Sequence, residues 1–405
     1  MQSGFKARLR CLEMNSKYPV IRFQKFPEEW LSTSLSSIVE DVSGNDGRTD
    51  LPVLTISAAR GWLTQEERFS QVIAGSQLNN YTLLNKDELS YNKGNSKTAE
   101  YGVVYRLNNH DSALVPKIYH SFRTTKKSDS LFIEKLFDSK KPDQELMKIV
   151  TSGARMDGLL NINKKNFYSI KVIVPSLKEQ TKIGEFFKEL DELIELQQLT
   201  IDKLEEMKKG FLHKMFIEKH QTKPKLRIKN FSNEWKSKTL SEIVFFYNNE
   251  RIPIEASKRE KGKYPYYGAT GIIDYINDYI FDGEYVLLAE DGANILTRNS
   301  PLAYLTKGKF WVNNHAHVLK SKTENNYFLM YRLEQESYVK YNTGTAQPKL
   351  NNEVVRNIKF YIPDPEEQTQ IGEFFKKIDK LIDLERQELE ALQEMKKGFL
   401  QKMFV

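Results

Sequence analysis

Two stretches of the chain carry apolar residues at alternating steps of four and three, the pattern of a helix that pairs with another helix. They occupy residues 179–216 and 367–404, and 24 of their 38 aligned positions are identical at a constant offset of 188. A seam with a period of 3.5 residues predicts two long helices that pair as a left-handed coiled coil. The predicted seam residues are Ile183, Phe187, Leu190, Ile194, Ile201 and Leu204 in the first stretch and Ile371, Phe375, Ile378, Ile382, Leu389 and Leu392 in the second.

The same stretches contain start signals and a second set of apolar residues. Ser176 with Glu179, and Asp364 with Pro365 and Glu367, fit capping boxes at the helix starts. A helix of roughly 38 residues would be about 57 Å long. The apolar residues off the seam predict a second buried face, and they are Phe186, Leu193, Leu196, Met207, Phe374, Leu381, Leu384 and Met395. In the alternative interpretation, each helix packs only against its own domain.

A shorter repeat precedes each of the two dissimilar segments that lie before the helices. PVIRFQKFPEEW (19–30) and PKLRIKNFSNEW (224–235) share Pro, Arg, Phe, Glu and Trp at an offset of 205. Strand-like apolar runs in the dissimilar segments indicate mixed α/β domains. We therefore predict an α+β protein in which two mixed α/β globular domains are separated by two long helices, paired antiparallel about a pseudo-two-fold axis. The predicted segments are an N-terminal extension (1–18), a first globular domain (19–175), a first helix (176–216), a linker (217–223), a second globular domain (224–363) and a second helix (364–405).

Charge and composition narrow the classes of partner. The net charge of +7 is concentrated in 19–178 (+4) and 224–366 (+3), whereas 179–216 and 367–405 carry −3 and −1. Positive globular segments favour a polyanion partner. The chain has one cysteine, Cys11, which excludes an internal disulfide framework, and it contains no apolar run long enough for a transmembrane helix. We expect a cytoplasmic protein that does not enter a membrane.

Motifs for intrinsic catalysis are missing from the sequence. It contains no GxxxxGK[ST] loop and no Pro-Pro dipeptide, so neither a phosphate loop nor the Asn/Asp-Pro-Pro-aromatic motif of amino-methyltransferases is present. His315 and His317 have a metal-like spacing, but no cluster of carboxylates or cysteines accompanies them. We expect these histidines to pack or to form hydrogen bonds, and we predict no catalytic residue and no metal site.

Loops of the two dissimilar segments combine Gly, Asn, Lys, Arg and Tyr, which suit contacts with phosphates and base edges. The candidate DNA-binding residues of the first segment are Arg60, Trp62, Tyr91, Lys93, Asn95, Ser96, Lys97 and Arg155. Those of the second segment are Tyr267, Thr270, Asn294, Arg298, Asn313, Asn314, Thr345, Gln347 and Lys349. Loops of this composition are also common as plain solvated turns, and that alternative stays open.

Taken together, these motifs resemble the specificity subunit of Type I restriction–modification enzymes. The resemblance covers roughly residues 19–405 and rests on the repeated EQ-x-x-IGEFF…EMKKGFL-x-KMF helices and the repeated [PF]-x-x-EW motifs. In the second dissimilar segment it also rests on YYGATGIIDY, LLAEDGAN, KFWVNNHAHVL and TGTAQPKL. In the first it rests on LPVLTISAARGWL and YNKGNSKTAEYG.

The resemblance implies a non-catalytic subunit that recognises a bipartite, asymmetric site on double-stranded DNA through two target recognition domains. It implies two docked modification (adenine methyltransferase) subunits and, in the full nuclease, two restriction (motor-nuclease) subunits. S-adenosylmethionine, ATP and Mg²⁺ would act in those partners, with no cofactor in this chain. Two unlike readers joined by stiff helices would place half-sites about one helical turn apart, on the order of 34 Å. The alternatives are a stand-alone structural or regulatory DNA-binding protein and an unrecognised nuclease.

Overall fold

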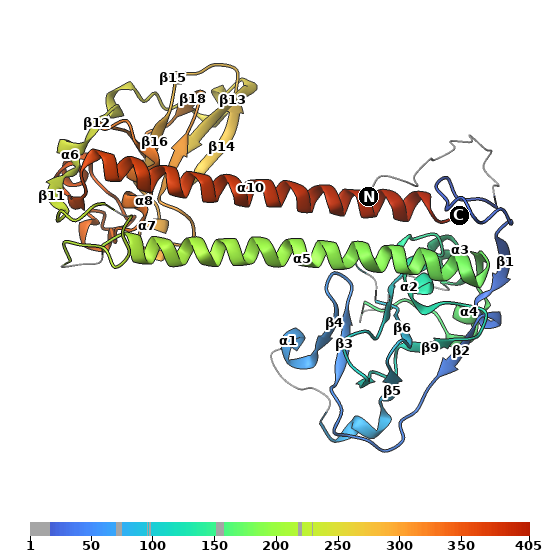
Figure 1. Ribbon diagram of the computed structural model, residues 1–405. Coiled ribbons are helices and arrows are strands. Elements are labelled where there is room, and N and C mark those ends of the chain that lie inside the picture. The colour runs from blue at the N-terminus through green and yellow to red at the C-terminus, as the bar shows by residue number, and fades with distance from the viewer. Residues whose placement is uncertain are drawn as a thin grey trace. The chain divides into compact units, whose positions relative to one another are not determined.

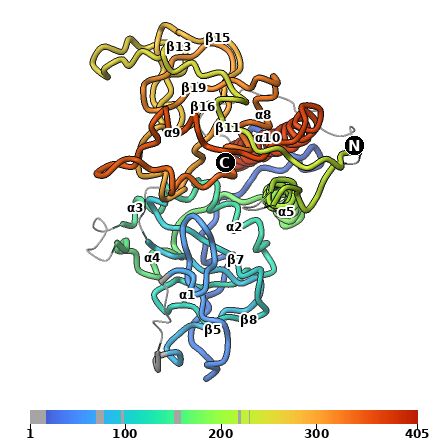
Figure 2. The backbone as a smooth tube through the Cα atoms, turned by 90° about the vertical axis from the view of Figure 1, so that its left-hand side faces the viewer, coloured from blue at the N-terminus to red at the C-terminus, as the bar shows by residue number. Residues whose placement is uncertain are grey.

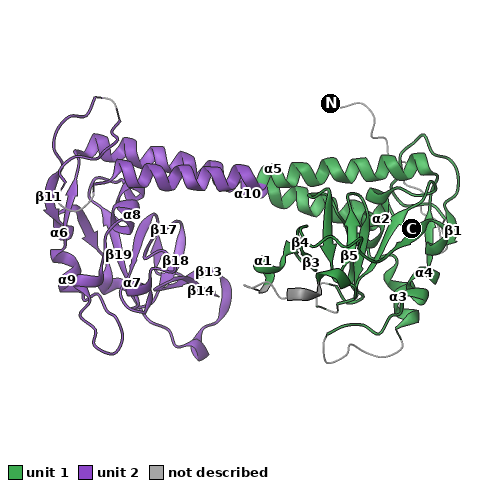
Figure 3. Ribbon diagram, turned by 90° about the horizontal axis from the view of Figure 1, so that it is seen from below, with its two compact units in different colours: residues 1–197, 388–405 green, residues 198–387 purple. Residues whose placement is uncertain are grey.

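Two long helices correspond to the sequence repeat (Figure 1). The structure is a computed structural model that describes residues 17–69, 75–94, 96, 99–150, 158–217, 221–228 and 230–405. Helix α5 spans Leu177–Met215 and α10 spans Pro365–Lys402. The chain divides into two compact units within these helices (Figure 3): unit 1 comprises residues 1–197 and 388–405, and unit 2 comprises residues 198–387. Each unit therefore contains part of both helices.

In unit 1 the beginning of α5 runs antiparallel to the end of α10. The rings of Phe186 and Phe399 meet edge to face with centroids 5.0 Å apart. Lys396 Nζ lies 2.7 Å from Asp191 Oδ1, and both side chains are partly exposed. The predicted antiparallel pairing is confirmed by these contacts.

Unit 2 repeats the same contacts with the two helices exchanged. The rings of Phe211 and Phe374 are again 5.0 Å apart, and Lys208 Nζ lies 2.6 Å from Asp379 Oδ1. Here the end of α5 contacts the beginning of α10. The seam is most deeply buried near the start of each helix and at Ile201; the buried seam residues are Ile183, Phe187, Leu190, Ile201, Ile371, Phe375, Ile378 and Ile382, while Ile194, Leu204, Leu389 and Leu392 are half-buried.

The globular part of unit 1 is built on an antiparallel sheet in the order β2–β9–β6–β7. These strands are β2 (Val39–Val42), β9 (His120–Thr124), β6 (Leu89–Asn92) and β7 (Val103–Arg106). Three antiparallel pairs accompany the sheet: β1 (Leu31–Ser34) with β10 (Lys171–Val174), β3 (Leu54–Ser57) with β4 (Gly61–Thr64), and β5 (Thr82–Asn85) with β8 (Ser112–Val115). The β5–β8 pair lies at the end of the unit away from the long helices (Figure 2). The short helices are η1 (Leu35–Ser37), α1 (Gln65–Phe69), η2 (Gly75–Asn80), α2 (Ser130–Asp138), α3 (Asp143–Ile149) and α4 (Lys164–Ser169).

The globular part of unit 2 has two four-stranded sheets. One has the order β12 (Val244–Phe246), β19 (Ala316–Ser321), β16 (Tyr285–Ala289) and β17 (Ala303–Thr306). The other has the order β14 (Gly271–Ile276), β13 (Lys261–Gly268), β18 (Lys309–Val312) and β15 (Phe281–Asp282), with β13 and β18 parallel. Strand β11 (Lys236–Thr239) pairs antiparallel with β20 (Lys359–Ile362). The short helices are α6 (Leu240–Ile243), η3 (Asn248–Glu250), η4 (Ala256–Lys258), α7 (Asn294–Thr297), α8 (Asn326–Glu334), η5 (Val339–Tyr341) and α9 (Asn352–Asn357).

The end of α10 completes the core of unit 1. Phe404 is buried, and its ring centroid lies 5.5 Å from that of Phe132, 5.9 Å from that of Phe187 and 6.3 Å from that of Trp30. Trp30 ends the first [PF]-x-x-EW motif and is fully buried. The short repeat, the first dissimilar segment and both long helices therefore meet in one core.

The end of α5 has the same role in unit 2. Phe216 lies 5.7 Å from Phe328, 5.9 Å from Phe375 and 6.2 Å from Trp235 between ring centroids. The alternative in which each helix packs only against its own preceding domain is wrong, because the closing phenylalanine of each core comes from the helix of the other repeat.

A matching ion pair joins the short repeat to the helix start in each unit. Arg22 donates to both carboxylate oxygens of Glu179, each at 2.7 Å, and Arg227 binds Glu367 with the same two distances. Both carboxylates are almost completely buried. The sequence assigned these glutamates to capping boxes, but their oxygens bind arginines, because the folded entry segment brings a guanidinium over each helix start. Among the described residues, no helix is long and apolar enough to cross a bilayer.

Candidate nucleic-acid interface

The loop that follows β6 contains most of the candidate residues of unit 1. Tyr91 is fully buried, stacks on Phe167 with ring centroids 4.4 Å apart, and donates its hydroxyl to the Tyr101 carbonyl at 2.7 Å. The prediction that Tyr91 contacts DNA is therefore wrong for this structure, since its ring belongs to the core and its hydroxyl supports the loop. Gly102, with φ of 82°, ends the loop where a Cβ would collide with Asn92 and Tyr91.

Within this loop, Ser96 is exposed and exchanges two backbone hydrogen bonds with Ala99, at 3.2 and 3.0 Å. Lys93 is half-buried, and its Nζ lies 3.4 Å from the Ile162 carbonyl. The candidates Asn95, Lys97 and Arg155 lie outside the described residues, so their roles stay predictions.

The β3–β4 hairpin carries the other two candidates of unit 1. Arg60 is exposed at the turn, directly before Gly61, whose φ is 72°. Trp62 is half-buried and donates its indole N–H to the Arg106 carbonyl at 3.0 Å. Arg60 is thus available at the surface, whereas Trp62 mainly fixes the hairpin on the rest of the unit.

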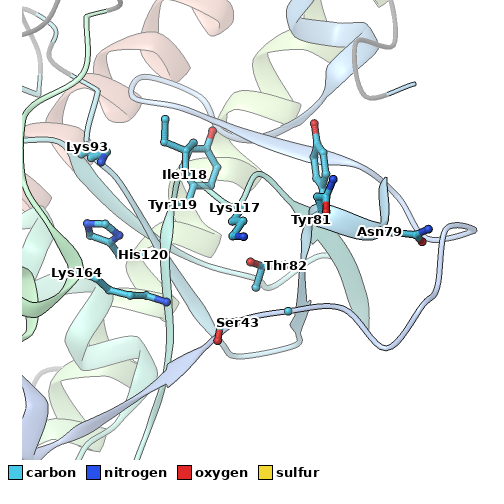
Figure 4. A pocket seen from close by; sticks show the side chains of 12 residues that line it. Ser43, Asn79, Tyr81, Thr82, Lys93, Lys117, Ile118, Tyr119, His120 and Lys164 are labelled. Carbon is cyan, nitrogen blue, oxygen red and sulfur yellow. The ribbon is translucent and has the colours of Figure 1, made fainter. Parts of the chain in front are cut away.

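A pocket of about 400 Å³ opens where several strands of unit 1 end (Figure 4). Lys93 is the one sequence candidate that lines it, together with Lys117, His120 and Lys164, which sequence reasoning missed. The other lining residues are Ser43, Gly44, Asn79, Asn80, Tyr81, Thr82, Ile118 and Tyr119. The three lysines lie far apart in the sequence. The one local signal is the run KIYH (117–120), which places Lys117 three residues before the start of β9.

Burial decides the charge state of the histidine in this pocket. His120 is largely buried, and this burial lowers its pKa to about 4, although a hydrogen bond to the Ile162 carbonyl acts in the opposite direction. The imidazole is therefore neutral at physiological pH, and the positive charge of the pocket comes from its lysines.

In unit 2 the TGTAQPK loop is held against the end of β16. Gly292 donates its backbone N–H to the Pro348 carbonyl at 3.0 Å, and Leu350 donates to the Glu290 carbonyl at 2.7 Å. The Asn342 side chain accepts from the backbone N–H groups of Gly344 and Lys349. With its base fixed at both ends, the loop presents its exposed candidates Thr345 and Gln347 to solvent.

A buried carboxylate lies beneath this loop. Glu290 accepts from Arg251 at 2.7 Å, and its other oxygen lies 3.6 Å from Lys349 Nζ. His317 is fully buried and hydrogen bonds to Asn248 and to the Leu350 carbonyl. Burial lowers the pKa of His317, more than the neighbouring Glu290 raises it. Lys349 is thus an exposed candidate that also takes part in fixing the loop.

The candidates near β13 and β18 divide into exposed and supporting residues. Thr270 and Asn314 are exposed. Asn313 is buried; it donates its backbone N–H to the Tyr267 carbonyl, and its side-chain oxygen accepts from the His315 backbone. Tyr267 is half-buried against Tyr304 and Phe310. The burial of Asn313 contradicts a direct contact by its side chain, and the exposed candidates here are Thr270 and Asn314, whose contact with DNA stays a prediction.

Asn294 and Arg298 stabilise a turn rather than presenting free polar groups. The Asn294 side chain bonds the backbone of Ser300 and Pro301. Arg298, in the left-handed conformation with φ of 53°, donates to the carbonyl and carboxylate of Glu334 at 2.5 and 2.8 Å. For Arg298 to contact a base, it would have to exchange these partners.

The predicted absence of a metal site concerns His315 and His317. His315 Nδ1 lies 2.7 Å from Asp291 Oδ2, while His317 is buried in the network described above. No group of three or more His, Cys, Asp or Glu side chains placed to hold a metal ion occurs in the described part of the chain.

A second candidate surface lies on the long helices, where the sequence predicted a second buried face. In unit 1, Leu193, Leu196 and Met395 are 49–60% exposed. We call these three residues apolar patch 1. The prediction is wrong for them, because the globular part of the unit covers only the neighbouring side of the helix pair, where Phe186 is half-buried.

Unit 2 has an equivalent surface. Leu381, Leu384 and Met207 are 41–51% exposed, and we call them apolar patch 2. Each residue of patch 2 lies 188 positions from its counterpart in patch 1, so the patches are repeated with the helices. Phe374, the remaining member of the predicted face, is half-buried like Phe186.

Comparisons with known proteins place the chain among restriction–modification proteins. The Haemophilus influenzae specificity subunit S.HindORF215P is 40% identical over 139 residues, which are 34% of this chain and 35% of that relative. The aligned part is thus about a third of the length of that protein. The Type I restriction enzyme MjaVIII specificity subunit of Methanocaldococcus jannaschii is 28% identical over 303 residues, covering 65% of this chain and 68% of the relative.

A solved structure and a family model complete the comparison. The crystal structure of the Type I restriction–modification system S subunit from M. genitalium superposes with a TM-score of 0.63 at 15% identity, covering 96% of this chain and 99% of that one, which shows a shared fold. The model of the Type I restriction modification DNA specificity domain matches residues 3–206 and 232–394. Since this match covers most of the sequence, the chain belongs to the family of Type I restriction–modification DNA specificity proteins.

Proposed function

We propose that this chain is a non-catalytic specificity subunit that reads a bipartite, asymmetric site on double-stranded DNA and docks two modification subunits. Two restriction subunits would join in the full nuclease. S-adenosylmethionine, ATP and Mg²⁺ would be used by those partners, which fits a sequence that lacks a phosphate loop and the amino-methyltransferase motif. One half of the DNA site would be read by each globular part.

The repeated apolar patches are the observation that carries the docking part of this proposal. Leu193 and Leu196 recur as Leu381 and Leu384, and Met395 recurs as Met207, all with at least 41% exposure. Clustered exposed apolar side chains mark interaction surfaces. Two surfaces of the same composition fit two copies of one partner, whereas a stand-alone DNA-binding protein has no use for them.

The DNA-reading part is supported by the contrast between the repeated helices and the dissimilar globular segments. The β6 loop of unit 1 and the TGTAQPK loop of unit 2 are both held at their base by backbone hydrogen bonds, and their sequences differ. Phosphate contacts position a protein on DNA, and contacts with base edges carry sequence information. Unlike loops in the two units therefore favour an asymmetric target.

Docking is tested by measuring the mass of the complex formed when the chain is co-expressed with its modification subunits. The variant Leu193→Lys/Leu196→Lys changes patch 1 alone, and Leu381→Lys/Leu384→Lys changes patch 2 alone. We expect each variant to retain one modification subunit in place of two, because a lysine disrupts an apolar contact. A control, Gln198→Lys, places one lysine at an exposed polar position of α5. Retention of two modification subunits by both patch variants would contradict the docking proposal.

The target is tested by methylome sequencing of cells that express the chain with its partners. We expect methylated adenines in one motif with two unlike halves and a fixed gap. An insertion of one heptad in both α5 and α10 should change the length of the gap and leave the specified bases unchanged. A palindromic motif, or an unchanged gap, would contradict this part of the proposal.

A further inference from the structure

We propose that the pocket of unit 1 lined by Lys93, Lys117 and Lys164 binds a phosphate of the DNA backbone, and that this contact sets the position of the β6 loop on the target. The inference rests on the proposed function and names a contact that the motifs alone did not identify. We call this site the lysine pocket.

Strand register brings the walls of the lysine pocket together. In the β2–β9–β6–β7 sheet, Val42 pairs with Ser121 and Tyr91 pairs with His120. The chain leaving β2 and the chain leaving β6 therefore lie on either side of the start of β9. Ser43 follows β2 directly, and Lys93 follows β6, so both reach the same edge.

The second wall comes from the neighbouring strand pair. Thr82, the first residue of β5, pairs with Val115, the last residue of β8. This pairing places Asn79 to Thr82 beside the connection that carries Lys117. Lys164 enters from the first turn of α4. Figure 4 shows Lys93, His120 and Lys164 on one side of the hollow and Tyr81 and Asn79 on the other.

The charge of the lysine pocket suits an anion. Its described lining contains three lysines and no Asp or Glu. Asp41 lies next to the pocket, with its Oδ1 2.5 Å from Lys164 Nζ, so lining and neighbour together carry a formal charge of +2. Partial burial raises the pKa of Asp41, but hydrogen bonds from Lys164 and Tyr168 outweigh it and the net pKa is lowered.

The lysines make the lining suited to the backbone of a nucleic acid. Of the three ring-bearing residues in the lining, Tyr119 and His120 are buried and offer no open face for stacking, while Tyr81 is half-buried and its hydroxyl accepts a hydrogen bond from Gln65. The Tyr119 hydroxyl is already bonded to Thr55 and to the Ile56 backbone. Lysine acts on phosphate as a mobile point charge, and the amides of Asn79 and Asn80 can add donors. A volume of about 400 Å³ leaves room for the sugar attached to the phosphate.

The position of Lys93 links this contact to sequence reading. Lys93 is the first residue after β6, and the candidate reading residues of the loop follow within four positions. A phosphate held at the base of the loop would therefore fix the distance between the backbone and the side chains that reach base edges. In this arrangement the lysine pocket contributes affinity and register, while base preference comes from the loop.

The test combines pocket variants with neutral phosphates. The full chain, assembled with its modification subunits, is bound to a duplex carrying the motif found by methylome sequencing. Methylphosphonates replace one phosphate at a time along both half-sites. The variants are Lys117→Gln and Lys164→Gln, and the control is Lys141→Gln, an exposed lysine that does not line the pocket.

We expect that replacing one particular phosphate, in one half-site, weakens DNA binding by the wild-type chain. The same replacement should not weaken DNA binding by the pocket variants any further. The slope of log K against log salt should fall in magnitude by about 0.9 in those variants, as expected for one lost phosphate contact. The methylated motif should stay the same. The control should keep the wild-type slope and its sensitivity to the methylphosphonate.

Three results would overturn the assignment of the lysine pocket. The first is a salt dependence of binding in both variants equal to that of the wild type. The second is an equal loss of affinity on methylphosphonate replacement in variants and wild type. The third is a changed base preference of a variant at one half-site. The failure of the proposed function is recognised separately, because in that case the wild-type assembly itself would bind no bipartite motif.

Discussion

Substitution of Phe404 by alanine tests whether the residues directly after α10 complete the core of unit 1. The side chain is 2% exposed and touches the rings of Trp30, Phe132 and Phe187. Burial among three rings leaves little freedom for the site to collapse, and a Phe→Ala change in such cores costs about 3–5 kcal/mol. We expect the free energy of unfolding of unit 1 to fall by that amount.

Hydrogen exchange measured by mass spectrometry separates the two units. Since 1.4 kcal/mol corresponds to a factor of ten, amides in β2, β6 and β9 that exchange through opening of unit 1 should exchange on the order of a hundred- to a few-thousand-fold faster. Amides of β16 and β19 in unit 2 should keep their rates. Gln401→Ala, an exposed position three residues before Phe404 at the end of α10, is the matched control. Unchanged exchange in unit 1, or acceleration confined to unit 2, would refute the assignment of Phe404 to this core.

Three further predictions concern the repeated helices and a buried histidine. Gly372→Ala should destabilise unit 2, because a Cβ at this position would collide with the side chain of Asn325, the N-cap of α8. Gly398→Ala should instead stabilise α10 by about 0.5–1 kcal/mol, because no atom lies within 4 Å of the added Cβ. Denaturant midpoints of the two variants measure this contrast, and a higher midpoint in both would contradict it. Glu367→Gln should lower the free energy of unfolding by about 3–5 kcal/mol, because the mostly buried guanidinium of Arg227 loses its charged partner. A denaturant midpoint equal to that of the wild type would show that this ion pair is dispensable. Burial lowers the pKa of His317 in the folded state, so the folded chain does not take up a proton that the unfolded chain binds below about pH 6.5. The free energy of unfolding should therefore fall as the pH drops from 7 to 5. The unfolding midpoint measured against pH should change less steeply in His317→Gln than in the wild type, and an equally steep change would count against this role of His317.

The long helices were predictable because their information is local and repeated. The heptad spacing and the offset of 188 gave α5 and α10 nearly to the residue, and pairing followed from the equivalence of the two copies. What the pattern could not give was the destination of each helix end. Phe216 and Phe404 look alike in the sequence, and only the folded chain shows that each closes the core containing the other repeat's domain.

The candidate interface was less predictable because composition does not reveal exposure. Tyr91 and Asn313 stand in loop-like sequence with suitable chemistry, yet one is packed and the other holds a neighbouring turn. Conversely, Lys117 and Lys164 belong to no motif, and only the folded chain brings them to the same pocket. Leu193 shows the same limit on the helices, where an apolar residue marks either a core or a binding surface.

The near-identity of the closing residues has an evolutionary consequence. The core of unit 1 is completed by Met403 and Phe404 at the end of the second repeat, and the first repeat ends in the same two residues, Met215 and Phe216. The segment between Trp30 and the start of α5 can therefore diverge, or be exchanged between genes, without a change in these closing residues. Under the proposed function, such a change would alter one DNA-reading part and leave unchanged the helices proposed to dock the modification subunits. If the proposed function holds, exchange of this gene segment would change the DNA target while the packing at the helix ends stays the same.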